Sequence, residues 1–245
     1  MSVGEALRYI RDDFADVVVA GGSEAPLAML SFGAFDLIKT MSRSTGDPAL
    51  ACRPFDRSRD GFVMGEGAAS LVIEELEHAR ARGARIYAEV LGYSLNNDAF
   101  HMTSPLPSGE SCIRAMHDAL ADAELAPEQI DYINAHASST QLNDNTETLS
   151  IKQTFNAHAP RIPVSGTKGY YAHPLGATGA IEAALCALAL DRQWIPPTIN
   201  YEHADPECDL DVVPNHGREA KLNYVMSNSF GFGGINACII LGRLV

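Results

Sequence analysis

Two histidines and a lysine stand out in this sequence because each lies in a segment of small residues that follows a strand-like run. His136 belongs to Asn-Ala-His-Ala-Ser-Ser-Thr at residues 134–140, and Lys168 and His173 belong to one loop at residues 165–180. Imidazole N–H groups and an ammonium group donate hydrogen bonds to an oxygen that gains negative charge. Together in one pocket, these side chains would polarise a carbonyl group.

A third segment, residues 228–236, offers backbone flexibility instead of charge. Gly231, Gly233 and Gly234 tolerate backbone angles that other residues resist, so neighbouring N–H groups can converge on one point. Each segment also has a simpler interpretation. A single histidine after a strand is often structural, the glycine run could be a tight hairpin, and residues 166–168 lack the earlier glycine of a phosphate-binding loop. The combination of the three favours a carbonyl-polarising site.

Alternating strand-like and helix-like segments must position these loops. Strands are expected at residues 16–22, 68–74, 86–93, 130–135, 163–165, 224–228 and 237–241. Helices are expected at residues 6–10, 76–82, 110–124, 144–155 and 177–190. Three adjacent valines in the first strand indicate burial on both faces, and Asp144 is the expected N-cap of its helix. The alternation predicts an α/β fold with mostly parallel central strands, whose sites gather at the carboxyl ends of the strands.

Composition argues against several other classes of function. The 245 residues are 46% apolar and 20% charged, enough apolar material for a sizeable core. Eighteen basic residues against 31 acidic ones give a net charge of −13, which argues against a general nucleic-acid-binding surface. The sequence has no apolar run of the roughly 18 residues that a membrane span requires. Residues 1–5 do not resemble a signal peptide.

The five cysteines are scattered along the chain, at positions 52, 112, 186, 208 and 238. They form no Cys-x-x-Cys pair, so we expect neither a disulfide framework nor a metal site. Unpaired cysteines fit a reducing compartment, and the expected location is the cytoplasm.

The three loops resemble the C-terminal motifs of the β-ketoacyl-acyl-carrier-protein synthases of the thiolase-like superfamily, most closely the bacterial synthase II type. Residues 134–140 match the family's Asn-Ala-His-Gly-Thr-x-Thr, and residues 168–179 match its Lys-x-x-x-Gly-His-x-x-Gly-Ala-x-Gly. Residues 228–236 carry its Asn-Ser-Phe-Gly-Phe-Gly-Gly-x-Asn intact. Further hallmarks lie at residues 16–24, 55–67, 196–200 and 208–211. The resemblance covers nearly the whole chain, in the family's order.

The resemblance implies a thiolase-like fold of layered α/β/α sheets, with an incomplete N-terminal half and a complete C-terminal half. The turn at residues 81–84 is the expected boundary, so residues 1–83 form the remainder of the N-terminal half and residues 84–245 the C-terminal half. The implied reaction joins an acyl thioester to malonyl held on acyl carrier protein, with loss of CO₂. It implies no cofactor beyond the phosphopantetheine arm of that carrier.

Residue roles follow from the resemblance, position by position. His136 and His173 resemble the pair of neutral imidazoles that donate to the malonyl thioester oxygen. Lys168 resembles the family's structural-electrostatic lysine, whose glutamate partner falls on Glu147. Glu182 matches a family carboxylate near the second histidine.

The remaining matched positions concern substrate binding. Ser138 and Thr140 resemble the hydroxyl residues that bind the pantetheine arm. Phe232 resembles the gating phenylalanine, whose backbone N–H also faces the oxyanion, whereas core packing is expected for Phe230. The chain departs from the family pattern at residues 137–138 and 141, and again at residues 170–172, where Tyr-Tyr-Ala replaces small residues.

The family's nucleophilic cysteine lies in a Thr-Ala-Cys turn at the head of the helix that opens this chain, and none of the five cysteines has that context. We therefore expect an acyltransferase that cannot condense acyl chains alone, either as a truncated product or with the segment supplied by a separate chain. A non-catalytic chain-length-factor-like subunit is the alternative, although such a partner needs neither histidine nor Lys168. A coenzyme A-dependent enzyme of the same superfamily is a weaker one.

The resemblance also implies partners. Acyl carrier protein is the expected substrate carrier, and the chain is expected to form a homodimer or to pair with a complementing N-terminal chain, without nucleic acid or membrane. Residues 16–20 would form an apolar edge strand prone to aggregation. The sequence leaves open the acyl chain length and the choice between fatty acid and polyketide synthesis.

Overall fold

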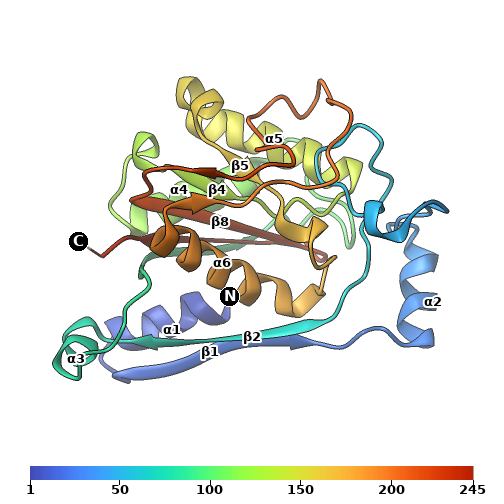
Figure 1. Ribbon diagram of the computed structural model, residues 1–245. Coiled ribbons are helices and arrows are strands. Elements are labelled where there is room, and N and C mark those ends of the chain that lie inside the picture. The colour runs from blue at the N-terminus through green and yellow to red at the C-terminus, as the bar shows by residue number, and fades with distance from the viewer. Residues whose placement is uncertain (245) are drawn as a thin grey trace.

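The computed structural model describes residues 1–244 (Figure 1). The helices are α1 (Ser2–Arg11), α2 (Met29–Ile38), α3 (Leu76–Ala81), α4 (Glu110–Asp122), α5 (Gln141–Phe155) and α6 (Thr178–Arg192). The longer strands are β1 (Val17–Glu24), β2 (Gly67–Glu74), β3 (Glu89–Asn97), β8 (Tyr224–Gly231) and β9 (Ile235–Gly242). The short strands are β4 (Tyr132–Asn134), β5 (Val164–Ser165), β6 (Trp194–Ile195) and β7 (Arg218–Glu219). The α/β class predicted from the sequence is confirmed.

The central sheet has five strands in the order β3-β9-β8-β4-β5. β4 runs parallel to both of its neighbours, β5 and β8. β9 is antiparallel to both β8 and β3. The prediction of mostly parallel central strands is therefore wrong for half of the sheet. The physical reason is the short turn between β8 and β9, because a tight hairpin can join antiparallel strands only.

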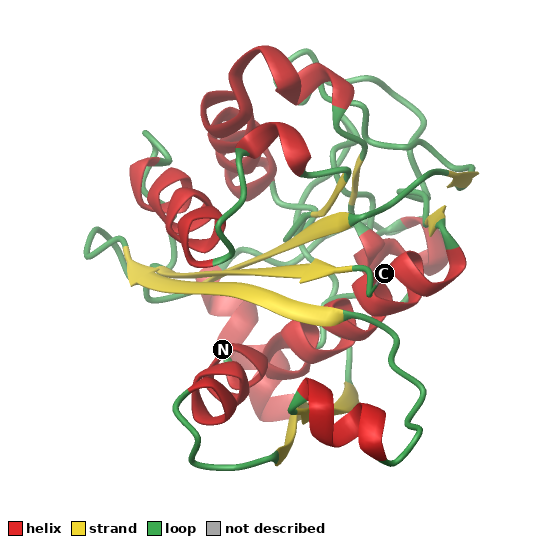
Figure 2. Ribbon diagram, turned by 90° about the vertical axis from the view of Figure 1, so that its left-hand side faces the viewer, coloured by secondary structure: helices red, strands yellow, loops and turns green. Residues whose placement is uncertain are grey.

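The sheet lies between two layers of helices (Figure 2). α4 and α5 cover one face, and their core includes Met116, Ile133 and Ile151. α1 and α6 cover the other face, and their core includes Leu7, Ala183 and Leu190. The small residues of α6 allow this helix to approach the sheet on one side and the ribbon of β1 and β2 on the other.

β1 and β2 form a separate two-stranded antiparallel ribbon outside α1 and α6. Val19 and Val72 face each other across this ribbon and are 71% and 62% exposed. The prediction that the first strand is buried on both faces is therefore wrong. Only one face of the ribbon packs on helices, so a run of valines here indicates strand propensity more than burial.

The start of α5 differs from the predicted one. Thr140 is its N-cap, and its hydroxyl accepts a hydrogen bond from the backbone N–H of Asn143 at 3.2 Å. Asp144, the predicted N-cap, is fully buried and accepts instead from the N–H of Phe55 at 2.9 Å. The helix starts earlier because Thr140 also supplies a capping oxygen, while the carboxylate of Asp144 is taken up by the N–H of Phe55. No helix within residues 1–244 is long and apolar enough to cross a membrane.

Candidate active site

A cavity of about 840 Å³ opens at the carboxyl ends of β4 and β8. The loop after β4 brings His136 to it, and the loop after β5 brings His173. The β8–β9 turn contributes Phe232, as expected for loops that leave strands at one edge of a sheet. The structure thus brings together the three segments singled out in the sequence.

The rings of His136 and His173 lie side by side, with centroids 5.2 Å apart and planes inclined at 75°. Burial is the main cause that holds the pKa of both imidazoles well below the usual 6.5, and the nearby Lys168 charge adds to it. Both rings are therefore neutral at pH 7. Nδ1 of His173 lies 3.0 Å from the hydroxyl of Thr178, and a ring that accepts the threonine proton carries its own proton on Nε2.

Lys168 is fully buried in the loop behind the histidines. Its ammonium group lies 2.5 Å from Oε1 of Glu182 and also donates to the backbone carbonyl of His136. The pairing with Glu147 implied by the resemblance is therefore wrong, since Glu182 is the partner. Burial raises the pKa of Glu182 to about 7, and the attraction of Lys168 opposes that rise.

Glu147, in α5, binds backbone N–H groups of the His136 loop and not Lys168. Its two carboxylate oxygens accept the backbone N–H groups of His136 at 2.9 Å and Ala137 at 2.8 Å. Asn228, the first residue of the 228–236 motif and part of β8, donates to the same carboxylate at 3.2 Å. Burial raises the pKa of Glu147 to about 6. Glu147 thus fixes the backbone that carries His136, in a loop where Ala137 takes the left-handed φ of 42°.

The two predicted pantetheine residues line the same cavity as the histidines. The hydroxyls of Ser138 and Thr140 lie 2.9 Å apart and both face it. The intervening Ser139 turns the other way and is fully buried, with its hydroxyl accepting from the N–H of Arg53 at 3.0 Å. The backbone at Ser139 is left-handed, with a φ of 67°.

Phe232 lies at the mouth of the cavity and is 42% exposed. Its ring stacks on Phe35 of α2, with centroids 6.2 Å apart. Gly233 and Gly234 follow it with φ of 80° and 74°, which turns the hairpin without strain. Phe230 is buried as predicted, and its ring lies 6.1 Å from that of His136.

Sequence reasoning missed three side chains that contact the site. Phe62 presents its ring to His173 at a centroid distance of 5.6 Å. Thr178 contacts the same histidine, and Tyr171 hydrogen-bonds Glu182. Phe62 lies within a segment recognised as a family hallmark. Tyr171 lies in the loop of His173 and Thr178 begins α6 just after it, so their closeness in sequence to His173 was a signal for them.

None of the five cysteines lines the cavity, and all five are buried free thiols. Burial raises the pKa of Cys52 and of Cys208 to about 12. It likewise raises the pKa of Cys112, Cys186 and Cys238. A thiol of this kind is a poor nucleophile at neutral pH, because the thiolate is the reactive form.

Comparison with known protein families decides to which family the chain belongs. Residues 1–79 match the model "Beta-ketoacyl synthase, N-terminal domain", and residues 87–202 match "Beta-ketoacyl synthase, C-terminal domain". The chain belongs to the β-ketoacyl synthase family. It is 48% identical over 243 residues to 3-oxoacyl-[acyl-carrier-protein] synthase 2 of Coxiella burnetii, covering 99% of this chain and 59% of the relative. The resemblance to the synthase II type is thereby confirmed.

Other members of the β-ketoacyl synthase family extend the match. A putative polyketide beta-ketoacyl synthase 1 of Streptomyces cyaneus is 50% identical over 240 residues, covering 98% of this chain and 57% of that protein. Among solved structures, a type II polyketide ketosynthase bound to its acyl-carrier protein superposes with a TM-score of 0.97 at 40% identity, covering 99% of this chain and 60% of that one.

A synthase of Burkholderia phymatum STM815 superposes with a TM-score of 0.94 at 42% identity, covering 100% of this chain and 59% of that one. These neighbours confirm the thiolase-like fold. The chain thus spans 57–60% of the length of these family members.

Proposed function

We propose that this chain carries the enolate-stabilising part of a 3-oxoacyl-acyl-carrier-protein synthase site. The observation that supports it is the pair of buried, neutral imidazoles, 5.2 Å apart in one cavity. Each ring can donate one N–H to the same substrate oxygen without protonating it. Donors of this kind in a water-poor site contribute roughly 3–4 kcal/mol each to the stabilisation of an oxyanion.

The chemistry begins with a malonyl thioester whose carbonyl oxygen lies between the two rings. The bond between its α-carbon and its carboxylate breaks, CO₂ leaves, and the electron pair forms the thioester enolate. His136 and His173 hold the negative oxygen. In the complete reaction the α-carbon then attacks an acyl thioester, and the thiolate of that thioester leaves.

The other cavity residues would bind and orient the carrier-bound substrate. Ser138 and Thr140 present two adjacent hydroxyls that suit the amides of a phosphopantetheine arm. Phe232 would gate the acyl side of the cavity from its position against Phe35. Acyl carrier protein is the proposed partner, and the chain needs no resident cofactor for these steps. The cytoplasmic location remains a proposal, supported by five unpaired cysteines.

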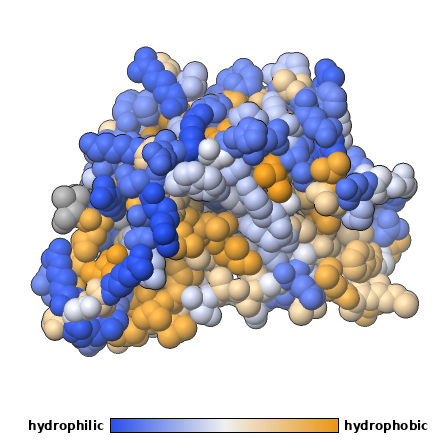
Figure 3. Space-filling model, in the orientation of Figure 1, coloured by the Kyte–Doolittle hydropathy of each residue, from blue (hydrophilic) through white to orange (hydrophobic). Residues whose placement is uncertain are grey.

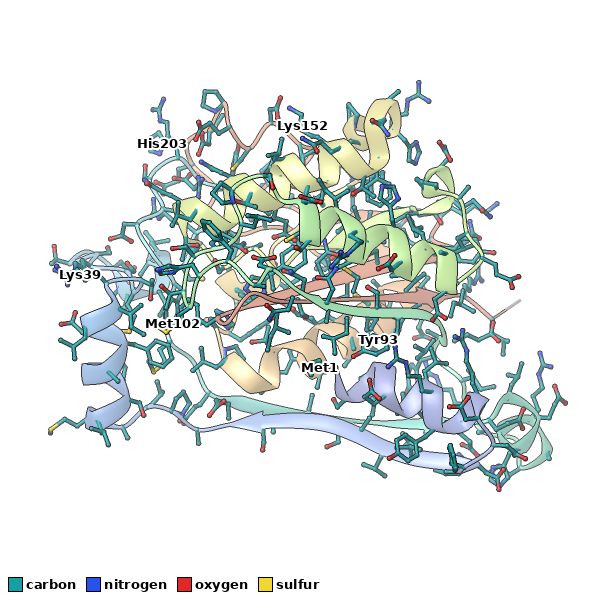
Figure 4. All side chains as sticks on the ribbon, turned by 180° about the vertical axis from the view of Figure 1, so that it is seen from behind. Met1, Lys39, Tyr93, Met102, Lys152 and His203 are labelled. Atoms are coloured by element: carbon teal, nitrogen blue, oxygen red, sulfur yellow. The ribbon has the colours of Figure 1, made fainter. Side chains whose placement is uncertain are left out.

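The nucleophilic thiol is proposed to come from outside these 245 residues, because no cysteine of the chain reaches the cavity. Met1, the N-cap of α1, and the first two residues of that helix, Ser2 and Val3, do line it. Figure 4 shows Met1 at the inner end of α1, beneath the central sheet. A thiol delivered at this end of α1 would face the two histidines, whether it belongs to a longer chain or to a complementing one.

Two half-reactions test the proposal separately. We expect the chain alone to convert malonyl-carrier protein to acetyl-carrier protein and CO₂, with the enolate carbon taking a proton from solvent water, and not to condense acyl chains. Replacing both His136 and His173 by alanine should lower the decarboxylation rate at least 100-fold, roughly the effect of removing oxyanion donors. His117→Ala, at an exposed position of α4, is the control and should leave the rate unchanged.

Two results would contradict the proposal. A folded chain without decarboxylation would remove the case for the histidine pair, and condensation by the chain alone would show that it holds a nucleophile. The alternative, a chain-length-factor-like subunit, predicts that a reconstituted complex keeps its activity when both histidines are replaced. Retention of His136, His173 and Lys168 speaks against that alternative.

A further inference from the structure

Tyr171 stands at the end of a row of buried hydrogen-bonding side chains. The phenol of Tyr132 and the hydroxyl of Ser165 lie 2.6 Å apart. Asn134 donates weakly to Tyr132 at 3.3 Å and to Thr167 at 3.4 Å. The hydroxyl of Thr167 lies 2.7 Å from that of Tyr171. The row connects β4 and β5 to the loop that carries His173.

The phenol of Tyr171 continues the row to Glu182, because it donates to Oε1 of that carboxylate at 3.4 Å. Lys168 donates to the same oxygen at 2.5 Å, while Oε2 has no hydrogen-bond partner within residues 1–244. Tyr171 is thus the second of two donors to a fully buried carboxylate. Lys168 in turn holds the carbonyl of His136.

The neighbouring tyrosine makes no comparable contact. Tyr170 is 54% exposed, although the two residues have the same side chain and adjacent positions in the motif. The sequence pattern of the family has small residues at both positions, so from the sequence alone the two tyrosines form a single departure from that pattern. The structure separates them, since only Tyr171 reaches the charged pair.

We propose that Tyr171 is a positioning residue of this site: its hydrogen bond helps keep Glu182 a carboxylate, which keeps Lys168 in place under His136. The catalytic role of Tyr171 rests on the proposed function, whereas its hydrogen bond to Glu182 does not depend on that function. Burial raises the pKa of the Tyr171 phenol, so the group stays protonated and remains a donor at neutral pH. A small side chain at this position could not supply that donor.

The environment of Glu182 sets the direction of the expected effect. Burial raises its pKa to about 7, and the donors oppose that rise. The titratable groups that face it from all packed elements are Lys168 and Tyr171 in the loop, Glu147 of α5, Tyr132 of β4 and Cys186 of α6. Of these, Lys168 and Tyr171 stabilise the charged form. Removing the phenol hydroxyl therefore raises the pKa of Glu182 further.

The test is a carboxyl titration of the chain labelled with ¹³C at the glutamate side chains and followed by NMR. Glu182→Gln assigns the signal. We expect Tyr171→Phe, which removes one oxygen and keeps the ring, to raise the Glu182 midpoint by roughly half a pH unit or more. Tyr170→Phe is the matched control and should leave the midpoint in place. An unchanged midpoint in Tyr171→Phe, or an equal shift in Tyr170→Phe, would overturn the proposal.

A second variant covers the case in which Tyr171→Phe fails to fold. Thr167→Val removes the hydroxyl that orients the phenol, and it should shift the Glu182 midpoint upward by a smaller amount. No shift in that variant would again count against the proposal. Decarboxylation measured against pH separates this inference from the proposed function: the acid limb should move upward with the Glu182 midpoint. A shifted titration in an inactive chain would refute the function and leave the hydrogen bond intact.

Discussion

At the scale of single residues, two alanines next to the histidines adopt backbone angles that normally belong to glycine. Ala137 has a φ of 42° and Ala172 a φ of 60°, and the family motif has glycine at both positions. A left-handed conformation costs a residue with a Cβ roughly 1–2 kcal/mol. The methyl group of Ala137 is fully buried and offsets part of that cost, whereas Ala172 is only half-buried. Strain is therefore concentrated in the loop that presents His173.

Replacing Ala172 by glycine should consequently stabilise the chain by about 1 kcal/mol. The matched control is Ala184→Gly, at a half-buried position within α6, which should destabilise by about 1 kcal/mol because glycine lowers helix propensity. Urea unfolding monitored by circular dichroism gives both values. Equal destabilisation by the two substitutions would mean that Ala172 is not strained.

The buried histidines predict a loss of stability in acid. Their folded-state pKa lies well below 6.5, so the unfolded chain binds more protons than the folded chain below about pH 6.5. Their contribution to stability is present above that pH and falls as the pH decreases, by about 1 kcal/mol per histidine for each pH unit. The raised pKa values of Glu147 and Glu182 act in the opposite sense, since those groups favour the folded state when protonated.

A comparison of two proteins isolates the contribution of the histidines to the pH dependence of stability. The doubly substituted His136→Asn, His173→Asn chain keeps both glutamates, so the difference between it and the parent chain reflects the imidazoles. We expect the parent chain to lose about 2 kcal/mol more than the variant between pH 7.5 and 5.5, measured by urea unfolding. Parallel pH profiles for the two proteins would show that the rings are not desolvated as the structure indicates.

At the scale of elements, the position of the motif loops could be predicted from the sequence, but the residues that contact them could not. The three motif loops meet at one edge of the sheet because each follows a strand of that sheet, and periodicity revealed those strands. The glutamate partner of Lys168 was misassigned, because a position matched by resemblance does not show which carboxylate the side chain contacts. Glu182 lies one turn into α6 and faces the lysine, while Glu147 is occupied by two backbone N–H groups. The orientation of the hairpin and the exposure of β1 also depend on tertiary packing.

Helix α1 illustrates how an element can set the shape of the site. Its first residues line the cavity, and Gly4 packs directly on the ring of Tyr93 in β3, where an added Cβ would come within 2.2 Å of the ring. We expect Gly4→Ala to destabilise the chain by roughly 1–3 kcal/mol through overpacking. Gly33→Ala in α2 is the control, because nothing lies within 4 Å of its added methyl group and helix propensity should stabilise it by up to about 1 kcal/mol. Thermal unfolding of both variants checks the contrast, and a gain in stability from Gly4→Ala would show that α1 does not pack as described.

At the scale of the whole molecule, the net charge and the exposed apolar surface have opposite effects on association between copies of the chain. The net charge is −13, which opposes association between copies of the chain. Large apolar side chains are exposed on the ribbon and on α2, including Val19, Val72, Met29, Leu30 and Leu37. Figure 3 shows apolar residues gathered in the lower part of the view, where Figure 1 places β1, β2 and α2. An apolar patch of this kind, on a ribbon with open strand edges, favours self-association.

We therefore expect the isolated chain to self-associate, and more strongly at high salt, because salt screens the repulsion and leaves the apolar attraction. Replacing the cross-strand pair by Val19→Lys and Val72→Glu keeps the net charge and places opposite charges face to face, so the ribbon itself should remain stable. Sedimentation velocity at several protein concentrations should show smaller species for this double variant. Leu142→Lys, at a position in α5 that is 63% exposed, is the control and should associate like the parent chain. A parent chain that stays monomeric at high salt, or a control that loses association equally, would show that the ribbon face does not drive it.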